Sequence, residues 1–213
     1  MSLTKRIHNL KERKINILGH EQYFKSAVLL PLVENQGQLS VLFEQRSRHL
    51  NHQPGEICFP GGSIEPSDSN EAQAAIRETC EELGITPDDI EVIAPLDLLV
   101  TPFNLIIYAY LCEINDYHKV HPNPNEVEDV FCIPINHLQL SSYKYYQIDI
   151  IPKPVDDFPF ELIPGGRQYN WRNGIYPVYF YIYEGRVIWG LTARILNHFL
   201  SLCDQSDIVM SGT

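Results

Sequence analysis

Three glutamates lie close together between residues 78 and 82, in a segment of strong helix formers. Successive residues of an α-helix are rotated by about 100°, so Glu78, Glu81 and Glu82 share one side of a helix. Neighbouring carboxylates repel each other, and a hard divalent cation with oxygen ligands such as Mg²⁺ relieves that repulsion, commonly together with substrate phosphates. The alternative is a solvated acidic helix face, which is common for such clusters.

Small and flexible residues flank the acidic cluster. Gly61 and Gly62 precede the helix, and because glycine has no Cβ the chain can approach a ligand closely there and offer a backbone carbonyl to a metal. Ala74 and Ala75 fall on the acidic side, one turn earlier, and are predicted to leave room for an approaching group. The other side, with Ile76, Cys80 and Leu83, is predicted to be the apolar back of the helix.

The helix that carries the acids is the best defined element of the sequence. It is predicted over residues 70–83, with Gly84 at the position of a left-handed C-terminal cap. Asp68 is followed three residues later by Glu71, which favours Asp68 as the N-cap of this helix. The alternative interpretation, that Asp68 belongs to the acidic site, is less favoured.

The remaining pattern predicts strands before and after this helix. Two apolar runs, SAVLLPLVE and QLSVLFEQR, flank residues 35–38 and predict a β-hairpin, and residues 49–69 predict a loop. Further strands are expected at 90–100, 105–112 and 127–133, and in YYQIDII, YPVYFYIY and VIWG. The aromatic run in YPVYFYIY is expected to be sheet core rather than a surface for stacking bases.

The ends of the chain carry weaker signals. Leu3, Ile7 and Leu10 predict a short amphipathic helix within an N-terminal extension over 1–20, and a second helix is expected over 191–202. Residues 204–213 are expected to be a tail. Without repeats or a low-complexity linker, residues 1–213 are interpreted as a single domain.

Composition limits the classes of partner and compartment. Lys and Arg number 16 and Asp and Glu number 27, so the formal charge of 16 − 27 = −11 disfavours binding to nucleic acid or anionic membranes. Five widely spaced cysteines without a CxxC pair predict neither a disulfide framework nor a zinc ribbon. With no signal peptide or apolar stretch of membrane-spanning length, we expect a cytoplasmic protein.

The segment from Gly62 to Ile85, with its RETCEELGI block, resembles the Nudix box. It departs from the usual pattern in having Asp68 at the first glutamate position, eight residues between Asp68 and Arg77, and Thr79 in place of an apolar residue. The resemblance implies the Nudix fold, an α/β architecture with a mixed β-sheet flanked by helices in an α/β/α sandwich. It also implies hydrolysis of a diphosphate bond with Mg²⁺ or Mn²⁺.

The stretch before the box, RSRHLNHQPGEICFPGG, is similar to that of the coenzyme A diphosphatase branch of the family, which shares the one-residue expansion. The segments NEVEDVF and WGLTARIL resemble further parts of that branch. Three positions depart from the branch: Asn51 replaces an Arg, Gln53 a His and Glu56 a Gln. The resemblance implies that coenzyme A or acyl-coenzyme A is cleaved to 4′-phosphopantetheine and adenosine 3′,5′-bisphosphate.

The resemblance also implies roles for individual residues. Glu78, Glu81 and Glu82 would bind the metal, and Arg77 would orient a carboxylate. The general base is either a glutamate of the box or one from a later loop, for which Glu126 is the candidate; an exposed loop acid is the equal alternative.

Substrate contacts are expected from Gly61, Gly62, Arg46 and Arg48, although Arg48 is equally compatible with an exposed arginine at a strand end. The three departures motivate ADP-ribose or a nucleotide sugar as the alternative substrate. An alternative of another class is a nucleotide-sensing Nudix module without turnover. A small-molecule nucleotide diphosphate is the expected partner, and a homodimer is possible.

Overall fold

The first two strands of the molecule form a β-hairpin, as the sequence predicts. A computed structural model gives the fold of residues 7–8, 10–139 and 142–210. Strand β1 (Phe24–Asn35) pairs antiparallel with β2 (Gln38–Arg46). Gln36 and Gly37 between them have φ angles of 52° and 75°, which is the left-handed geometry of the tight turns that suit twisted hairpins.

Eight strands form one mixed sheet around this hairpin. Its central order is β3-β2-β1-β7-β5, with β4 paired to β1, β6 to β7 and β8 to β2. The added strands are β3 (Ile57–Cys58), β4 (Gly61–Ser63), β5 (Ile90–Pro95), β6 (Leu99–Val100), β7 (Leu105–Ile114) and β8 (Val127–Pro134). β1 pairs parallel with β7, whereas the other pairings of this sheet are antiparallel.

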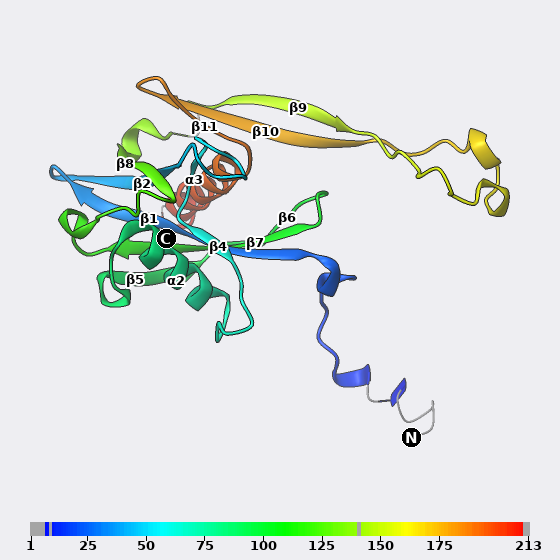
Figure 1. Ribbon diagram of the computed structural model, residues 1–213, viewed down its shortest axis with the longest axis horizontal. Coiled ribbons are helices and arrows are strands. Elements are labelled where there is room, and N and C mark those ends of the chain that lie inside the picture. Colours follow the sequence, from blue (N-terminus) through cyan, green and yellow to red (C-terminus); the bar gives the residue numbers. More distant parts are fainter. Residues whose placement is uncertain (1–6, 9, 140–141, 211–213) are drawn as a thin grey trace.

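Both faces of the sheet are covered, which explains why β1 is almost continuously apolar. Ala27 and Leu29 pack with Ala74 and Ala75 of helix α2 (Glu71–Leu83) on one face. Leu30 points to the other face, into the core that includes helix α3 (Gly190–Met210). Figure 1 shows α2 on one side of the sheet and α3 with the last strands on the other. The predicted α/β fold, with a mixed sheet flanked by helices, is confirmed.

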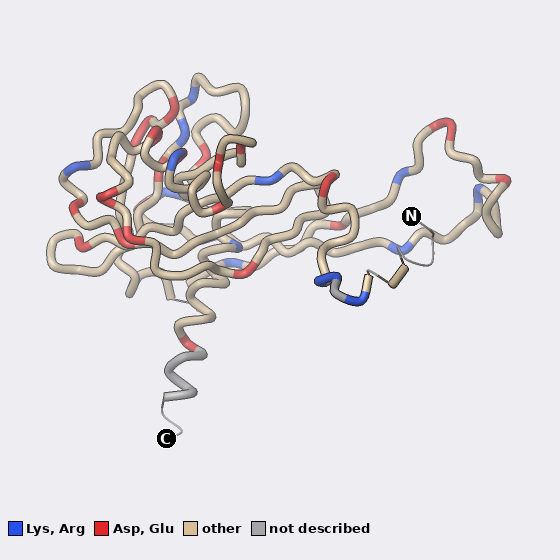
Figure 2. Tube along the Cα trace, turned by 90° about the horizontal axis from the view of Figure 1, so that it is seen from below, with Lys and Arg blue, Asp and Glu red and all other residues tan. Residues whose placement is uncertain are grey.

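The last three strands form a separate sheet in the order β11-β10-β9. They are β9 (Lys144–Ile150), β10 (Gly174–Tyr183) and β11 (Arg186–Trp189). β9 and β10 extend away from the body as a long arm, which is visible from two directions (Figures 1 and 2). Tyr176, Val178 and Tyr181 are buried, so the aromatic run of β10 contributes to the sheet core as expected.

Helix α2 agrees with the sequence in its extent but not in its cap. Gly84 ends the helix with a φ of 65°, and its N–H donates to the carbonyl of Cys80. The N-cap is Asn70, whose side chain accepts a hydrogen bond from the Gln73 N–H at 3.0 Å. The prediction that Asp68 caps the helix is therefore wrong.

The ends of the chain differ from expectation where the structure describes them. α3 continues past the predicted end at 202 to Met210, so the expected tail is helical over most of its length. The predicted N-terminal helix falls largely on residues outside the described ones. The described residues in this part of the chain are 7–8, followed by a 3₁₀ turn at Leu10–Glu12. Within the described part of the chain, no helix is both long and apolar enough to cross a membrane.

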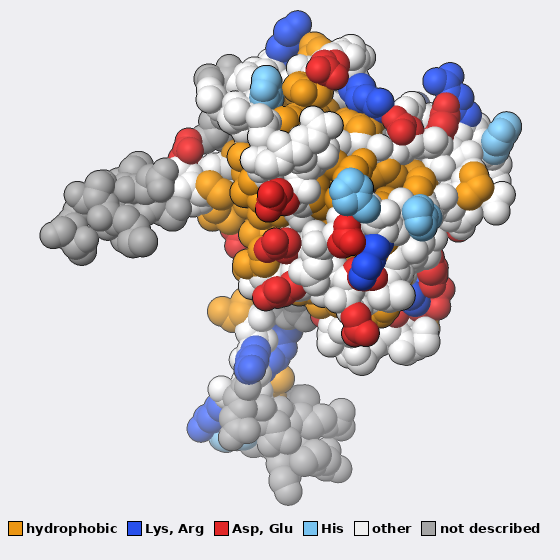
Figure 3. Space-filling model, turned by 90° about the vertical axis from the view of Figure 1, so that its left-hand side faces the viewer, with side chains coloured by type: hydrophobic (Ala, Val, Ile, Leu, Met, Phe, Trp, Pro, Cys, Tyr) orange, Lys and Arg blue, Asp and Glu red, His pale blue; other side chains and the backbone are white. Residues whose placement is uncertain are grey.

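The surface carries charges of both signs. On the face seen in Figure 3, acidic side chains lie beside Lys and Arg, and apolar side chains are exposed between them.

Gly84, at the end of α2, packs against the loop that follows β7, and its replacement tests this contact. A Cβ at Gly84 would collide with the carbonyl oxygen of His121, whereas a Cβ at Gly37, also at positive φ, would meet nothing within 4 Å. Gly37→Ala should cost about 1 kcal/mol through backbone strain, and Gly84→Ala at least about 2 kcal/mol. Urea unfolding of both variants measures the difference, and equal losses would contradict the packing described here.

Candidate active site

Two carboxylates on the acidic side of α2, those of Glu78 and Glu82, face strand β4 of the sheet. The N–H of Gly61 in β4 donates a hydrogen bond to Glu82 Oε2 at 2.8 Å. Glu82 is 4% exposed, and Ala74 and Ala75 on the same side are fully buried against β1. The solvated acidic face is therefore excluded for Glu82, and the expectation that the alanines leave open room is wrong, because the sheet fills that space.

The two glycines of β4 permit this close approach. Gly61 has a φ of 141°, and a Cβ there would collide with the backbone of Ala27 and Val28 in β1. At Gly62 a Cβ would lie 2.5 Å from the carboxyl carbon of Glu78. The glycines therefore bring the backbone of β4 against the carboxylates.

Arg77 organises the outer part of the site. Its guanidinium donates two hydrogen bonds to the carboxylate of Asp68, at 3.0 and 3.1 Å, and one to Glu78 Oε1 at 2.9 Å. A further hydrogen bond from the guanidinium reaches the carbonyl of Ser63, the last residue of β4. The hydrogen bonds from Arg77 lower the pKa of Asp68. Asp68 thus belongs to the acidic site, as the less favoured interpretation held, and anchors the arginine that positions Glu78.

The three glutamates of the cluster have different surroundings. Glu82 is buried and the Glu78 side chain is 18% exposed, whereas the Glu81 side chain is 54% exposed and lies 3.6 Å from Arg77. The structure brings Glu78 and Glu82 together against β4 and leaves Glu81 at the rim.

Glu44 is a further acidic residue of the site, which our sequence reasoning missed. Its side chain is fully buried, and Oε1 accepts a hydrogen bond from Cys58 Sγ at 3.3 Å, while Oε2 has no hydrogen-bond partner among the described residues. The alternation of β2 contained a signal, because Glu44 follows Leu42 by two residues and so points to the same face, toward α2. A charged residue at an inward strand position indicates a special environment.

These carboxylates oppose each other's ionisation. Burial raises the pKa of Glu82 to about 9, and repulsion from Glu44 adds to the effect. Burial also raises the pKa of Glu44 to about 7, and raises that of Glu78. The site therefore holds more carboxyl groups than its neighbours can keep ionised, which is the condition that a divalent cation relieves.

The carboxylates supply the oxygen ligands that a hard cation prefers, although their side chains do not converge on one point. Among the described residues, no three acidic, His or Cys side chains are placed to hold one metal ion together. In this arrangement Gly61, Cys58 and Arg77 donate to the acids. The unpartnered Oε2 of Glu44 and the close contact of Glu78 with Gly62 indicate where oxygen ligands are available.

Glu126 comes to the site on the loop before β8. The N–H of Asn123 donates to the carbonyl of Glu82 at 2.8 Å, which ties this loop to the end of α2. Asn123 Nδ2 also donates to Glu126 Oε1 at 3.3 Å. The charge of Glu126 raises the pKa of both Glu44 and Glu78, so Glu126 lies within electrostatic range of the acidic core.

A cavity of about 400 Å³ opens beside β4, and only one of the two predicted arginines lines it. Its lining includes Arg46, Gly61 and Gly62, and the Nε of Arg46 is buried without a hydrogen-bond partner among the described residues. Arg48 does not line the cavity; it is 73% exposed and pairs with Glu128 at 3.2 Å. Arg46 thus lies at this cavity, whereas Arg48 lies outside its lining.

Of the three positions that depart from the coenzyme A branch, two line the cavity and one does not. Gln53 and Glu56 both line the cavity, and Gln53 Nε2 donates to Glu56 Oε2 at 3.2 Å. Asn51 is exposed and does not line the cavity.

Glutamates and an arginine of one helix, packed against a glycine strand of a mixed sheet, define a hydrolase of the Nudix class. Residues 23–153 match the family described as the NUDIX domain. The chain belongs to the Nudix hydrolase family, and the resemblance seen in the sequence is confirmed.

Similar proteins support the family without fixing the substrate. The chain is 35% identical over 132 residues to "Peroxisomal coenzyme A diphosphatase NUDT7" of Mus musculus, a match that covers 62% of this chain and 56% of that protein. "Nudix hydrolase 3" of Caenorhabditis elegans is 30% identical over 83% of this chain and 72% of its own length. A solved MutT/nudix family protein from Enterococcus faecalis has the same fold at 16% identity, with a TM-score of 0.50, and covers 96% of this chain and 70% of its own.

Glu82→Gln should stabilise the metal-free protein while removing most turnover. A carboxyl whose pKa rises from 4.5 in the unfolded chain to about 9 in the fold destabilises the protein progressively as pH increases between those values. Glutamine keeps the acceptor for Gly61 without the charge. With a chelator present, the melting temperature of the variant should exceed that of the wild type at pH 8, by about 2–4 °C per kcal/mol, and the gap should shrink toward pH 5.

A gap of the same size at both pH values would show that charge at residue 82 does not carry the effect. The turnover number with metal should fall by at least about ten-fold, equivalent to about 1.4 kcal/mol.

Glu78→Gln and Glu81→Gln form a matched pair that separates the inner from the outer glutamate. Because Glu78 lies against Gly62 and Glu81 lies at the rim, we expect Glu78→Gln to raise the metal concentration for half-maximal activity by about 10- to 100-fold, and Glu81→Gln by less. Titration of activity with Mg²⁺ and Mn²⁺ measures both. A larger effect at Glu81 would place the metal on the solvent side of the helix.

Proposed function

We propose that this Nudix hydrolase cleaves the diphosphate bond of coenzyme A or an acyl-coenzyme A, giving 4′-phosphopantetheine and adenosine 3′,5′-bisphosphate. The observation that carries the diphosphatase activity is the group of mutually repelling carboxylates beside the glycine strand, next to a cavity that Arg46 lines. The choice of substrate is supported by the sequence before the Nudix box and by the similarity to the coenzyme A diphosphatase from mouse. That match covers 56% of the length of the mouse protein.

Glu78 and Glu82 would hold Mg²⁺ or Mn²⁺, with Glu81 completing the set from the rim. Carboxylate oxygens are the ligands that these hard cations prefer. When bound, the divalent cation activates a water molecule and neutralises charge that develops on the diphosphate. A backbone carbonyl of Gly61 or Gly62 is the further oxygen donor that we propose.

The chain's own residues position the reactants. Arg77, held by Asp68, fixes the orientation of Glu78. Arg46 would bind a substrate phosphate through its guanidinium, since its Nε is buried without a partner in the described structure. Glu126 is our proposed general base, which would accept the proton of the attacking water at its carboxylate; the loop tie through Asn123 holds it near the acidic core.

ADP-ribose or a nucleotide sugar is the second candidate substrate. The observation that favours it is the presence of Gln53 and Glu56 in the cavity, where the coenzyme A branch has other residues. A sensing module without turnover is disfavoured by the presence of all three of Glu78, Glu81 and Glu82.

A screen of the purified protein with Mg²⁺ or Mn²⁺ against coenzyme A, acetyl-coenzyme A, ADP-ribose and nucleoside triphosphates tests the proposal. We expect the highest kcat/KM for a coenzyme A compound, with both products identified by mass, and loss of activity with a chelator. Preference for ADP-ribose would establish the alternative substrate, and no turnover of any compound would favour the sensing module.

Arg46→Gln and Arg48→Gln test the assignment of the phosphate contact. A charge-assisted hydrogen bond is worth about 1.5–3 kcal/mol, so Arg46→Gln should lower kcat/KM by about 10- to 100-fold. Arg48→Gln is the matched control, because Arg48 is exposed and paired with Glu128, and its kcat/KM should change by less than about three-fold. Equal effects of the two substitutions would contradict the assignment.

A further inference from the structure

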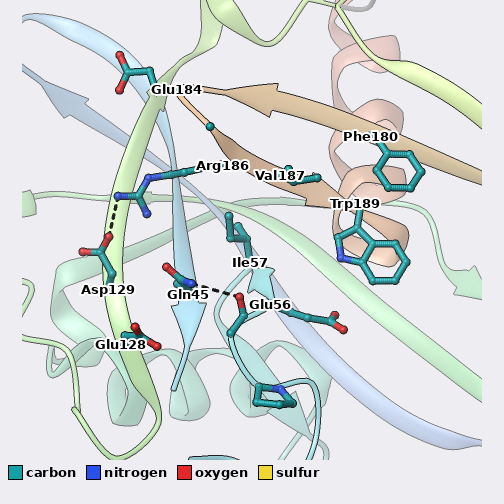
Figure 4. Close-up of a pocket in the computed structure, with 13 residues that line it drawn as sticks. Gln45, Glu56, Ile57, Glu128, Asp129, Phe180, Glu184, Arg186, Val187 and Trp189 are labelled. Atoms are coloured by element: carbon teal, nitrogen blue, oxygen red, sulfur yellow. Dashed lines mark hydrogen bonds and ion pairs between the residues drawn. The ribbon is translucent and has the colours of Figure 1, made fainter. Parts of the chain in front are cut away.

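A second cleft adjoins the cavity of the active site. It has a volume of about 940 Å³ and is bordered by residues 54–57, by β8 and by the β10–β11 hairpin (Figure 4). Glu56 and Trp189 line both this cleft and the cavity beside β4. A substrate whose diphosphate lies at β4 could therefore extend one of its two halves into the cleft.

One wall of the cleft is aromatic and accessible. Phe180 and Trp189 are paired across β10 and β11, and their rings stack with centroids 5.9 Å apart and an interplanar angle of 14°. Trp189 remains 43% exposed and the neighbouring Val187 41% exposed. Figure 4 shows both rings beside the hairpin backbone. Covering such a surface with an apolar group is favourable, because apolar area is removed from water.

The polar part of the lining is acidic. Four carboxylates line the cleft against a single cation, Arg186; they belong to Glu56, Glu128, Asp129 and Glu184. Arg186 is already engaged, since it lies 2.8 Å from Asp129 and its guanidinium stands 4.0 Å over the ring of Phe131. An anionic group entering the cleft would lose hydration and meet repulsion, whereas amide N–H donors would find acceptors.

We propose that this acidic aromatic cleft binds the uncharged half of the substrate, the pantetheine chain with its amides and its acyl group. This inference rests on the proposed function. The amide N–H groups donate to the carboxylates, and the acyl end covers Trp189 and Val187. The adenosine half, which carries the 3′-phosphate, binds outside the cleft.

Fluorescence of Trp189 tests the occupant directly. The chain has two tryptophans, Trp171 and Trp189, and Trp171 lies on the arm against Phe158 and Tyr169. Trp171→Phe, which retains an aromatic ring on the arm, therefore leaves Trp189 as the reporter. Titration with 4′-phosphopantetheine and its acetylated form should change the emission with saturation, and adenosine 3′,5′-bisphosphate should not. A response to the adenosine compound alone, or to none, would overturn the inference.

Kinetics of a matched pair of variants give a second readout. Val187→Glu places a charge in the apolar wall, and Val155→Glu places the same charge at a site that is 67% exposed and does not line the cleft. Val187→Glu should raise KM for an acyl-coenzyme A with a long acyl chain by at least about five-fold, with less effect on coenzyme A, since only the long acyl chain buries apolar surface against this wall. Val155→Glu should leave both unchanged.

The two proposals fail in different ways. If no coenzyme A compound is hydrolysed, the proposed function is wrong, and the Trp189 titration still decides what the cleft binds. If coenzyme A compounds are hydrolysed and the two valine variants behave alike, the function stands and the assignment of the cleft is wrong.

Discussion

The site depends on the burial of Glu82 beside Glu44, two carboxyl groups that cannot both be ionised without compensation. Burial and mutual repulsion raise the pKa of Glu82 to about 9, and the Gly61 N–H at 2.8 Å opposes that rise only in part. An isolated pair of this kind would be eliminated from a core that existed for stability alone. Its presence indicates a site that is completed by positive charge from outside the chain, and the Nudix family supplies that explanation through its divalent cation.

The rest of the fold serves to hold this unfavourable arrangement in place. β1 is apolar on both faces, so α2 and α3 pack on opposite sides of it and fix α2 against the sheet. Gly61 and Gly62 remove the side chains that would keep the β4 backbone away from the helix. Arg77 joins Asp68 before the helix to Glu78 within it, and thereby sets the direction of the outer carboxylate. The strain of like charges is thus opposed by packing and by fixed donors.

Charge is distributed unevenly around the substrate path. The cavity beside β4 is lined by Arg46, whereas the cleft beyond Glu56 and Trp189 is lined by four carboxylates and a cation that is already paired. A substrate with a central diphosphate and two unlike halves would therefore meet different environments on its two sides. In our proposal, the orientation of such a substrate would be set by electrostatics and by the Phe180–Trp189 stack. The chain's formal charge of −11 is consistent with a local rather than a global attraction for phosphate.

The sequence alone determined the features that depend on local chain chemistry. The hairpin turn at residues 36–37, the helix from 71 to 83 with its Gly84 cap, most of the strands and the acidic cluster with its glycines were all readable, because turn geometry, helix propensity and motif spacing act over a few residues. Only the tertiary structure decided that Glu82 is buried, that Glu44 joins it, that Asp68 binds Arg77 while Asn70 caps the helix, and that Arg46 but not Arg48 reaches the cavity. Those outcomes depend on which strand lies against which face of α2, and a pairing between residues 44 and 82 leaves no trace in the spacing of either segment.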